Sequence, residues 1–367
     1  MGSTINLEED REVLTFLAFL FVLGALVLVH ELGHFLVAKL LGIRVLVFSF
    51  GFGPKLIKAR LGETEYAISL FPLGGYVKLL GEEAEEEIPP QEKARSFVFR
   101  PLWQKALVVG AGPLSNLIFS SLLFAFLFFT GVPRLLPIVG EVVPGYPAQR
   151  AGLKTGDRIL LIDGKRINYW DDLLKIIPKS EGRPLKFHIK RNEEEFQIVI
   201  TPQATKVKDI FGEERTHYQI GIVPRGDFVK VRWKGWESLG LGFKETVRVS
   251  ELVILGIWKI LSGAISAKTV GGPIMIAQMA GQEAKKGFQQ LIFFTAIVGV
   301  NIGLLNLFPI PILDGGHLLL YGLQALLRRP FDPKKLEFLQ KIGLVIIVLL
   351  MLFAFYNDLL RIWGQIK

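Results

Sequence analysis

The chain has 367 residues, of which 50% are hydrophobic, with a formal net charge of +9 and no cysteine. This composition is too apolar for an ordinary soluble protein of this length, and the lack of cysteine excludes disulfides and thiolate metal sites. Excess Lys and Arg in such a chain is typical of loops that face the cytoplasm or anionic lipid, so we expect a lipid bilayer and no nucleic acid as partner.

Four stretches are long and apolar enough to cross a bilayer, which requires about 20 residues of helix. They lie at about 13–41, 103–130, 288–307 and 342–360. The first has the acidic flank Glu8-Glu9-Asp10 and lacks a small-residue cleavage site, so we interpret it as a retained span and not as a signal peptide. A further stretch at 252–265 is interrupted by Lys259 and is more typical of a helix at the membrane interface.

The first span contains the motif His30-Glu31-Leu-Gly-His34. Imidazoles at this spacing lie on one face of a helix, about 6 Å apart along its axis, so both can reach one Zn²⁺ at about 2.0–2.1 Å. Glu31 lies about 100° round the helix and can take a proton from a zinc-activated water and deliver it to the leaving amine. Three polar side chains on one turn are costly inside a membrane, which favours a metal site over a chance match.

A catalytic zinc needs a third protein ligand, and Asp314 and His317 are the two candidates. Both lie after the third span in Asn306-Leu-Phe-Pro309-Ile-Pro311-Ile-Leu-Asp314-Gly315-Gly316-His317. Pro309 and Pro311 are expected to end the helix and favour extended backbone, and the pair Gly315-Gly316 to allow a sharp turn. The spacing does not choose between the two candidates, and an aspartate beside glycines is also typical of a helix cap.

Residues 42–100 are predicted to form strands, because 48–54 and 65–71 alternate or are rich in aromatic residues, with turns at Gly62, Gly74 and Gly75. This segment is too apolar for a free loop, so we expect a β-sheet that dips into the membrane, then a solvated acidic linker at 82–90. A protease must unwind a transmembrane substrate, and a strand edge here or the segment 309–311 can hold the extended form. A hairpin that only anchors the protein is the alternative.

Residues 132–228 are strand-rich and more polar, so we expect a soluble domain inserted between the second and third spans. Its stretch 146–164 reads as a small helix, a turn and a strand that ends at Asp163-Gly164, and Trp170 opens a second helix. This pattern resembles a PDZ domain of the circularly permuted bacterial kind, which implies an α+β fold that accepts peptide termini along a strand edge. A folded spacer with an empty groove is the alternative.

Lysine and arginine are frequent between the first two spans and between the last two, which places both loops in the cytoplasm and the inserted domain outside. The predicted organisation is 1–41 (N-terminal segment and first transmembrane helix), 42–100 (β-hairpins and acidic linker), 101–131 (second transmembrane helix), 132–228 (PDZ domain and following strands), 229–287 (amphipathic helical segment, with a break at 271–273), 288–327 (third transmembrane helix and the segment with Asp314) and 328–367 (cytoplasmic loop and fourth transmembrane helix).

Four motifs together resemble the site-2 protease family of intramembrane zinc metalloproteases, in particular its bacterial regulator-of-sigma-E branch. They are His30-Glu-Leu-Gly-His34-Phe, Phe50-Gly-Phe-Gly-Pro54 with Pro72-Leu-Gly-Gly-Tyr-Val-Lys78, Gly112-Pro-Leu-Ser-Asn116, and Asn306 with Leu313-Asp314-Gly315. The resemblance covers nearly the whole chain. It implies an α-helical polytopic protein of the bacterial cytoplasmic membrane, with about four transmembrane helices, a re-entrant β-sheet and an inserted, extracytoplasmic α+β PDZ domain.

The resemblance also implies that Asp314 is the third zinc ligand and that Asn306 and Asn301 contact the substrate or the developing oxyanion. Interhelical hydrogen bonding is the alternative for both asparagines. With the strand edge and the proline segment, the predicted substrate-binding residues are Asn306, Asn301, Pro309, Pro311, Gly74 and Gly75.

We therefore predict a Zn²⁺-dependent intramembrane endopeptidase that cleaves single-pass membrane proteins, such as anti-sigma factors or signal-peptide remnants. One alternative is a catalytically silent membrane adaptor that carries a PDZ domain and a structural zinc. Structural zinc sites usually have four protein ligands, whereas two histidines and one aspartate leave an open position. Another alternative is a metal transporter, but that class is expected to place ionisable residues in several spans, and here they gather at one site.

Overall fold

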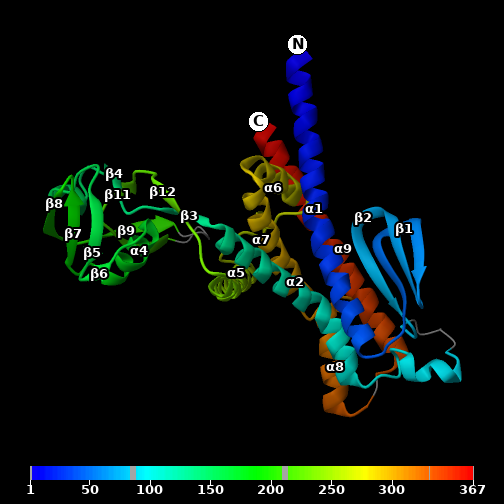
Figure 1. The fold of residues 1–367 in the computed structure, drawn as a ribbon. Helices are drawn as coiled ribbons and strands as arrows, with labels where there is room; N and C mark the ends of the chain where they lie inside the picture. Colours follow the sequence, from blue (N-terminus) through cyan, green and yellow to red (C-terminus); the bar gives the residue numbers. More distant parts are fainter. Residues whose placement is uncertain (1, 83–87, 209–213, 330, 367) are drawn as a thin grey trace. The chain divides into compact units, whose positions relative to one another are not determined.

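The computed structural model describes residues 2–82, 88–208, 214–329 and 331–366 (Figure 1). The chain forms two compact units. The first comprises Met1–Leu127, Gly235–Trp258 and Ser266–Lys367, and the second comprises Phe128–Lys234 and Lys259–Ile265. Most of the predicted acidic linker falls on residues 83–87, which lie outside the described residues.

Four long helices carry the predicted spans: α1 (Gly2–Leu40), α2 (Leu102–Thr130), α7 (Phe288–Asn306) and α9 (Pro333–Ile366). Each contains a stretch long and apolar enough to cross a membrane, namely Arg11–Leu40, Leu102–Thr130, Phe288–Asn306 and Lys334–Gly364. These four helices fit a polytopic membrane protein. The first and last are longer than the apolar stretches alone predict, because backbone hydrogen bonding continues a helix into polar flanks.

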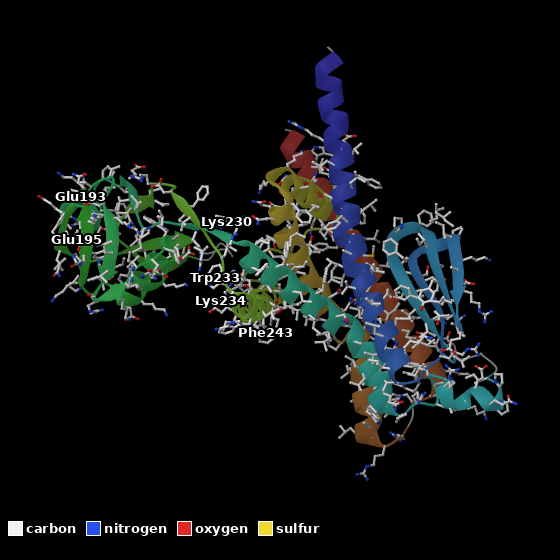
Figure 2. All side chains as sticks on the ribbon, in the orientation of Figure 1. Glu193, Glu195, Lys230, Trp233, Lys234 and Phe243 are labelled. Atoms are coloured by element: carbon white, nitrogen blue, oxygen red, sulfur yellow. The ribbon has the colours of Figure 1, made fainter. Side chains whose placement is uncertain are left out.

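The segment before the third span forms α5 (Gly235–Leu261), a short 3₁₀ turn η3 (Ala267–Thr269) and α6 (Pro273–Lys286). One face of α5 carries small residues and packs closely on α2, since a Cβ at Gly242 would lie 2.3 Å from the Ser121 carbonyl oxygen. Phe243, on another face of α5, is 63% exposed (Figure 2). The segment is therefore helical and interrupted before Pro273, while its amphipathic character and its place at the membrane interface stay predictions.

The N-terminus of α6 is capped by a residue that is distant in sequence. Asp358 of α9 is buried, and its carboxylate accepts hydrogen bonds from the backbone N–H groups of Gly272, Ile274 and Met275 at 3.0, 3.0 and 3.1 Å. The first N–H groups of a helix have no partner within the helix and favour a negative charge. The contact therefore fastens the last helix to the break at 271–273.

Two bent strands, β1 (Val45–Leu61) and β2 (Thr64–Leu79), form the sheet that packs beside α1 (Figure 1). Val47 pairs with both Lys78 and Glu65, and Ile68 pairs with both Phe50 and Ile57. The two strands therefore supply four sheet segments in the spatial order 75–79, 45–50, 64–69 and 55–61. This arrangement leaves two edges, at 75–79 and at 55–61.

The predicted turns in this sheet are correct at one site and wrong at another. Gly62 has a φ of +63° between the two strands, a conformation that favours glycine. Gly74 and Gly75 instead lie inside β2, which crosses there from one side of the 45–50 segment to the other. Small size is needed at these positions because a Cβ at Gly74 would lie 1.8 Å from the Phe52 ring.

A 3₁₀ turn η1 (Pro90–Arg95) leads into α2, and the second unit follows it. Its main sheet has the order β6-β5-β7-β8, and three two-stranded sheets pair β3 with β12, β4 with β11 and β9 with β10. The bounds are β3 (Val132–Leu135), β4 (Val139–Val142), α3 (Pro147–Arg150), β5 (Arg158–Ile162), β6 (Lys165–Arg166), α4 (Trp170–Ile176), η2 (Pro178–Ser180), β7 (Leu185–Arg191), β8 (Glu194–Ile200), β9 (Gln203–Lys208), β10 (Glu214–Gln219), β11 (Ile222–Pro224) and β12 (Phe228–Val231).

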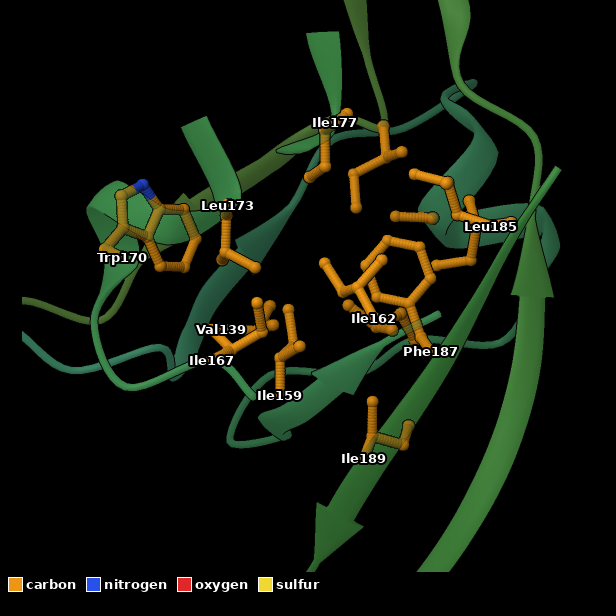
Figure 3. Packing of buried hydrophobic residues seen from close by; sticks show 14 residues of the cluster. Val139, Ile159, Ile162, Ile167, Trp170, Leu173, Ile177, Leu185, Phe187 and Ile189 are labelled. Carbon is orange, nitrogen blue, oxygen red and sulfur yellow. The ribbon is translucent and has the colours of Figure 1, made fainter. Parts of the chain in front are cut away.

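This inserted domain has its own hydrophobic core. Phe187 and Ile189 of β7 pack against Ile159 of β5 and Leu173 of α4, all at most 1% exposed (Figure 3). The opposite face of the sheet carries ion pairs, including His188 of β7 with Glu195 of β8 at 3.2 Å. The alternation of apolar and polar residues along these strands is typical of a sheet with one buried face.

Candidate metal centre

Three side chains that are far apart in the sequence converge in the first unit. His30 Nε2 lies 3.1 Å from Asp314 Oδ2 and 3.2 Å from His34 Nε2, and His34 Nε2 lies 3.7 Å from Asp314 Oδ2. The three side chains are 13–19% exposed, so bulk water is largely kept away. Within the described residues, they form the one cluster of three or more such groups that can hold a metal ion.

The geometry fits a zinc ion. Tetrahedral ligands at about 2.0–2.1 Å from zinc lie about 3.3–3.4 Å from one another. The three observed separations of 3.1, 3.2 and 3.7 Å bracket that value. Two imidazole nitrogens and one carboxylate oxygen are a common donor set for catalytic zinc, with the fourth position left for water or substrate. The roles of His30, His34 and Asp314 as ligands stay predictions, and the arrangement of their donor atoms supports them.

Local structure explains how Asp314 reaches the histidines. Helix α7 ends at Asn306, and Asp314 opens α8 (Asp314–Leu327). Between them the chain makes a tight turn, in which the Leu313 N–H donates to the Ile310 carbonyl at 3.0 Å and Ile312 has a φ of +89°. The N-cap of α8 is Leu313, whose side chain makes no capping hydrogen bond, so Asp314 is not the helix cap that its glycine neighbours also suggested.

The predicted sharp turn at Gly315-Gly316 is wrong. Both residues lie in the first turn of α8. A Cβ would lie 2.2 Å from the Leu307 carbonyl oxygen at Gly315 and 2.2 Å from the Ile310 carbonyl oxygen at Gly316. The glycines therefore allow the helix to pack directly on the backbone of 307–310, which holds Asp314 in place.

Helix α2 passes close to the two histidines, and glycines make this possible. A Cβ at Gly112 would lie 2.3 Å from His34 Nε2 and 2.8 Å from His30 Cε1. A Cβ at Gly33 would lie 2.4 Å from the Ala111 carbonyl oxygen. The resemblance had given the Gly112–Asn116 motif no role. A glycine, a proline and an asparagine inside an apolar span are the signal that could have marked this helix as part of the site.

The outer nitrogens of both imidazoles also face α2. His34 Nδ1 lies 2.8 Å from the Val108 carbonyl oxygen, to which it can donate, and His30 Nδ1 lies 3.4 Å from Asn116 Nδ2. An outer hydrogen bond of this kind sets the ring orientation and leaves Nε2 free for a metal. The predicted site residues did not include Val108 or Asn116.

Glu31 lies between the histidines and the sheet. Its Cγ would be 3.0 Å from a Cβ at Gly75, and the Val77 backbone N–H donates to its carboxylate. Electrostatic interactions couple this carboxylate to His30 and Asp314. The 75–79 edge of the sheet therefore lies directly against the predicted general base.

The remaining predicted residues surround this centre less closely. His317 lies one turn into α8, where its Nδ1 is 3.1 Å from the Leu313 carbonyl oxygen, and it is not a member of the three-residue cluster. The Asn301 amide donates to the Ile297 carbonyl at 2.8 Å, and Asn306 is half-buried at the end of α7. Pro309 is exposed, and Gly74 contacts Phe52. The substrate-binding roles of Asn301, Asn306, Pro309 and Gly74 stay predictions.

The inserted domain contains a groove of about 350 Å³. One side is lined by Trp170 and Leu173 of α4 and by Ile177, which follows the last residue of this helix. The segment 217–223 lines the other side. Gly221 has a φ of +77° and its Cα packs against Tyr146. The sequence interpretation predicted a peptide groove without naming these residues. The signal that could have marked one wall is the helical spacing of the apolar residues Trp170, Leu173 and Ile177.

Comparison with known proteins identifies the family of the chain. Residues 18–350 match peptidase family M50. A protein of Campylobacter jejuni is 38% identical over 351 residues, which are 95% of this chain and 94% of that protein. A protein of Rhizobium meliloti is 38% identical over 375 residues, which cover 98% of this chain and 100% of that protein. Both of these proteins are named "putative zinc metalloprotease".

Among solved structures, the chain is similar in part to PDZ domains of SdrC-like proteins. That of Listeria monocytogenes is 26% identical and covers 24% of this chain and 84% of its own, with a TM-score of 0.20. That of Listeria innocua is 25% identical and covers 24% of this chain and 92% of its own, with a TM-score of 0.20. For the chain as a whole, the match over residues 18–350 and the nearly full-length relatives show that it belongs to peptidase family M50.

Proposed function

We propose that this chain is a zinc-dependent endopeptidase that cleaves transmembrane segments of single-pass membrane proteins. Anti-sigma-factor-like proteins and signal-peptide remnants are the substrate classes. One observation carries the proposal: Asp314 of α8 converges with His30 and His34 beside a further carboxylate, Glu31, and the last three lie on α1, a helix apolar enough to span a membrane. A site of this kind can hydrolyse a peptide bond that lies at the depth of the bilayer.

The chain's own residues divide the chemistry between them. His30, His34 and Asp314 would hold the zinc ion, which when bound polarises the scissile carbonyl and acidifies the attacking water. Glu31 accepts a proton from that water as its oxygen adds to the carbonyl carbon. The same carboxylate returns the proton to the leaving nitrogen as the C–N bond breaks. The Val77 N–H, which donates to Glu31, orients the carboxylate for both transfers.

The substrate must be extended at the bond to be cut, because a helix keeps its carbonyls in its own hydrogen bonds. We place the extended stretch between the 75–79 edge of the sheet and the 309–311 segment, which Pro309 and Pro311 keep out of helix. Gly75 brings the edge against Glu31. In this arrangement, Asn306 and Asn301 are the candidate donors to the substrate carbonyl.

The sheet supports a position inside the membrane. Phe52, Leu56, Ile57, Leu61 and Phe71 are 49–75% exposed on it, which suits lipid better than water. We propose that the sheet is re-entrant from the cytoplasmic side of the cytoplasmic membrane and that the inserted domain lies on the other side, with its groove open to peptide termini. The basic loops between the spans support this orientation.

The decisive experiment replaces Glu31 by Gln in the full-length protein in detergent, with Glu12→Gln on the same helix as the matched control. We expect Glu31→Gln to keep its zinc, measured by elemental analysis. Its cleavage of a model transmembrane substrate is expected to fall by about 10²–10⁴-fold, the usual contribution of a general acid–base group. Wild-type activity in Glu31→Gln, with unchanged Glu12→Gln, would overturn the proposed role.

A further inference from the structure

A fully buried amide lies behind the metal centre. Asn116 is 0% exposed in the middle of α2, and its side-chain oxygen has no hydrogen-bond partner within the described residues. Buried polar atoms are nearly always hydrogen-bonded, and one left unpaired costs about 1–3 kcal/mol. An unpaired amide oxygen at this depth therefore points to a partner that depends on the state of the site.

The side chain next to this amide is His30, one of the three candidate metal ligands. Asn116 Nδ2 lies 3.4 Å from His30 Nδ1, on the side of the ring opposite to the converging donor atoms. The outer contact of His34 is of another kind, because its Nδ1 faces the Val108 carbonyl oxygen at 2.8 Å, and a carbonyl oxygen can only accept. The outer contact of His34 is thus made by backbone, whereas that of His30 is made by a side chain that can turn over.

The tautomer of the neutral His30 ring decides which amide atom of Asn116 is needed. When His30 Nε2 binds a metal, the ring proton lies on Nδ1, which then requires an acceptor. Without metal, a proton on Nε2 can be donated to Asp314 Oδ2 at 3.1 Å, and Nδ1 then accepts from the amide nitrogen. A rotation of the Asn116 amide by about 180° exchanges its oxygen and nitrogen and serves both states. It also gives the buried oxygen its partner in the metal-bound state.

We propose that Asn116 is a positioning residue for His30: its amide oxygen accepts the Nδ1 proton when a divalent metal is bound, which fixes the ring and directs Nε2 to the ion. The inference deepens the proposed function and rests on His30 being a ligand. It concerns metal binding alone, so it is tested without measuring proteolysis.

The test compares three variants of the full-length protein in detergent. Asn116→Leu has a similar size but no acceptor, Asn116→Asp keeps an acceptor and cannot donate, and Ser120→Ala is the matched control. Ser120 is also 0% exposed on α2 and its hydroxyl also lacks a partner within the described residues, but it packs against Gly299 and not against an imidazole. The readouts are the zinc dissociation constant by chelator competition and the melting temperature with and without zinc.

We expect Asn116→Leu to bind zinc about 10–100-fold more weakly, as is usual when the outer partner of a metal-binding histidine is removed. Its zinc-induced rise in melting temperature should shrink, while the melting temperature without zinc stays near that of Ser120→Ala. Asn116→Asp should bind zinc at least as tightly as the wild type, because a carboxylate is a stronger acceptor. A merely structural role would change the zinc-free melting temperature and leave zinc affinity alone.

Two results would overturn the inference. One is an Asn116→Leu protein that binds zinc as tightly as Ser120→Ala. The other is an Asn116→Asp protein as weak as Asn116→Leu, since size and packing would then explain both. If Asn116→Leu does not fold, the zinc affinity of Asn116→Asp decides between a positioning role and a merely structural role of Asn116. A zinc-binding but inactive wild-type protein would contradict the proposed peptidase activity and leave this inference unaffected.

Discussion

Gly112→Ala is the substitution for which the structure sets the clearest expectation. A methyl group at this position of α2 would lie 2.3 Å from His34 Nε2, 2.5 Å from His34 Cε1 and 2.8 Å from His30 Cε1. Ordinary contacts between such atoms are about 3.5 Å or longer. The imidazoles must therefore move by about 1 Å, and His34 cannot turn away without losing its contact with the Val108 carbonyl oxygen.

A metal site does not tolerate such a displacement, since ligand distances hold to within about 0.2 Å. We expect zinc affinity to fall by at least about 100-fold, more than for the loss of an outer hydrogen bond. The helix itself should not suffer, because alanine is favoured over glycine in a helix by about 0.5–1 kcal/mol. Metal loss without unfolding is therefore the expected signature.

The matched control is Gly110→Ala, two residues earlier on the same helix, where the nearest atoms to a Cβ are the Leu318 methyl groups at 3.8 Å. Zinc content after dialysis against a weak chelator and the dissociation constant by chelator competition would be measured for both proteins, with the zinc-free melting temperature as the check on folding. Retention of zinc by Gly112→Ala with an affinity within about twofold of Gly110→Ala would refute the reasoning.

Three further outcomes are expected. Asp314→Asn should weaken zinc retention in elemental analysis while His317→Ala should not, and the reverse result would transfer the ligand role to His317. Gly343→Ala, whose Cβ would lie 1.8 Å from the Pro311 carbonyl oxygen, should displace the segment before Asp314 and lower proteolysis about 10-fold. Gly364→Ala, whose Cβ would have no neighbour within 4 Å among the described residues, should leave proteolysis unchanged, and equal effects of the two substitutions would contradict this explanation. In the inserted domain, hydrogen bonds to Asp163 from the Lys186 N–H and from Arg183 hold the pKa of its carboxyl below the ordinary 3.8. That stabilisation is present above about pH 4 and is lost as the pH falls through the lowered pKa. Asp163→Asn should lower the free energy of unfolding by about 1 kcal/mol at pH 7 and flatten its decline in acid, measured by urea titration of residues 128–234. If the free energy of unfolding of Asp163→Asn declined in acid as steeply as that of the wild type, another group would be responsible for the decline.

Features that depend on neighbours in the chain could be predicted from sequence. The four apolar stretches were confirmed as long helices because a bilayer imposes a length that composition alone reveals. His30 and His34 share a helix face because the α-helical period places them there. The helix at Trp170 and the turn at Asp163-Gly164 follow from equally local signals.

Other features depend on contacts between distant segments, and sequence left them open or was wrong. Pattern alone did not separate Asp314 from His317. Asp314 lies in the cluster with His30 and His34 because of the turn at Ile312 and the packing of α8 on 307–310. Gly315 and Gly316 were predicted to turn the chain, yet they serve close packing, since glycine suits both purposes.

The sequence by itself determined that this protein is apolar, helical in four long stretches and equipped with two imidazoles and a carboxylate on one helical turn. Only the tertiary structure decided what surrounds them. It brings Asp314 within 3.1 Å of His30, Val108 and Asn116 behind the imidazoles and the 75–79 edge against Glu31. The physical reason is that periodicity encodes which face of an element is buried, whereas the partner of that face is selected by packing among elements that the chain joins over hundreds of residues.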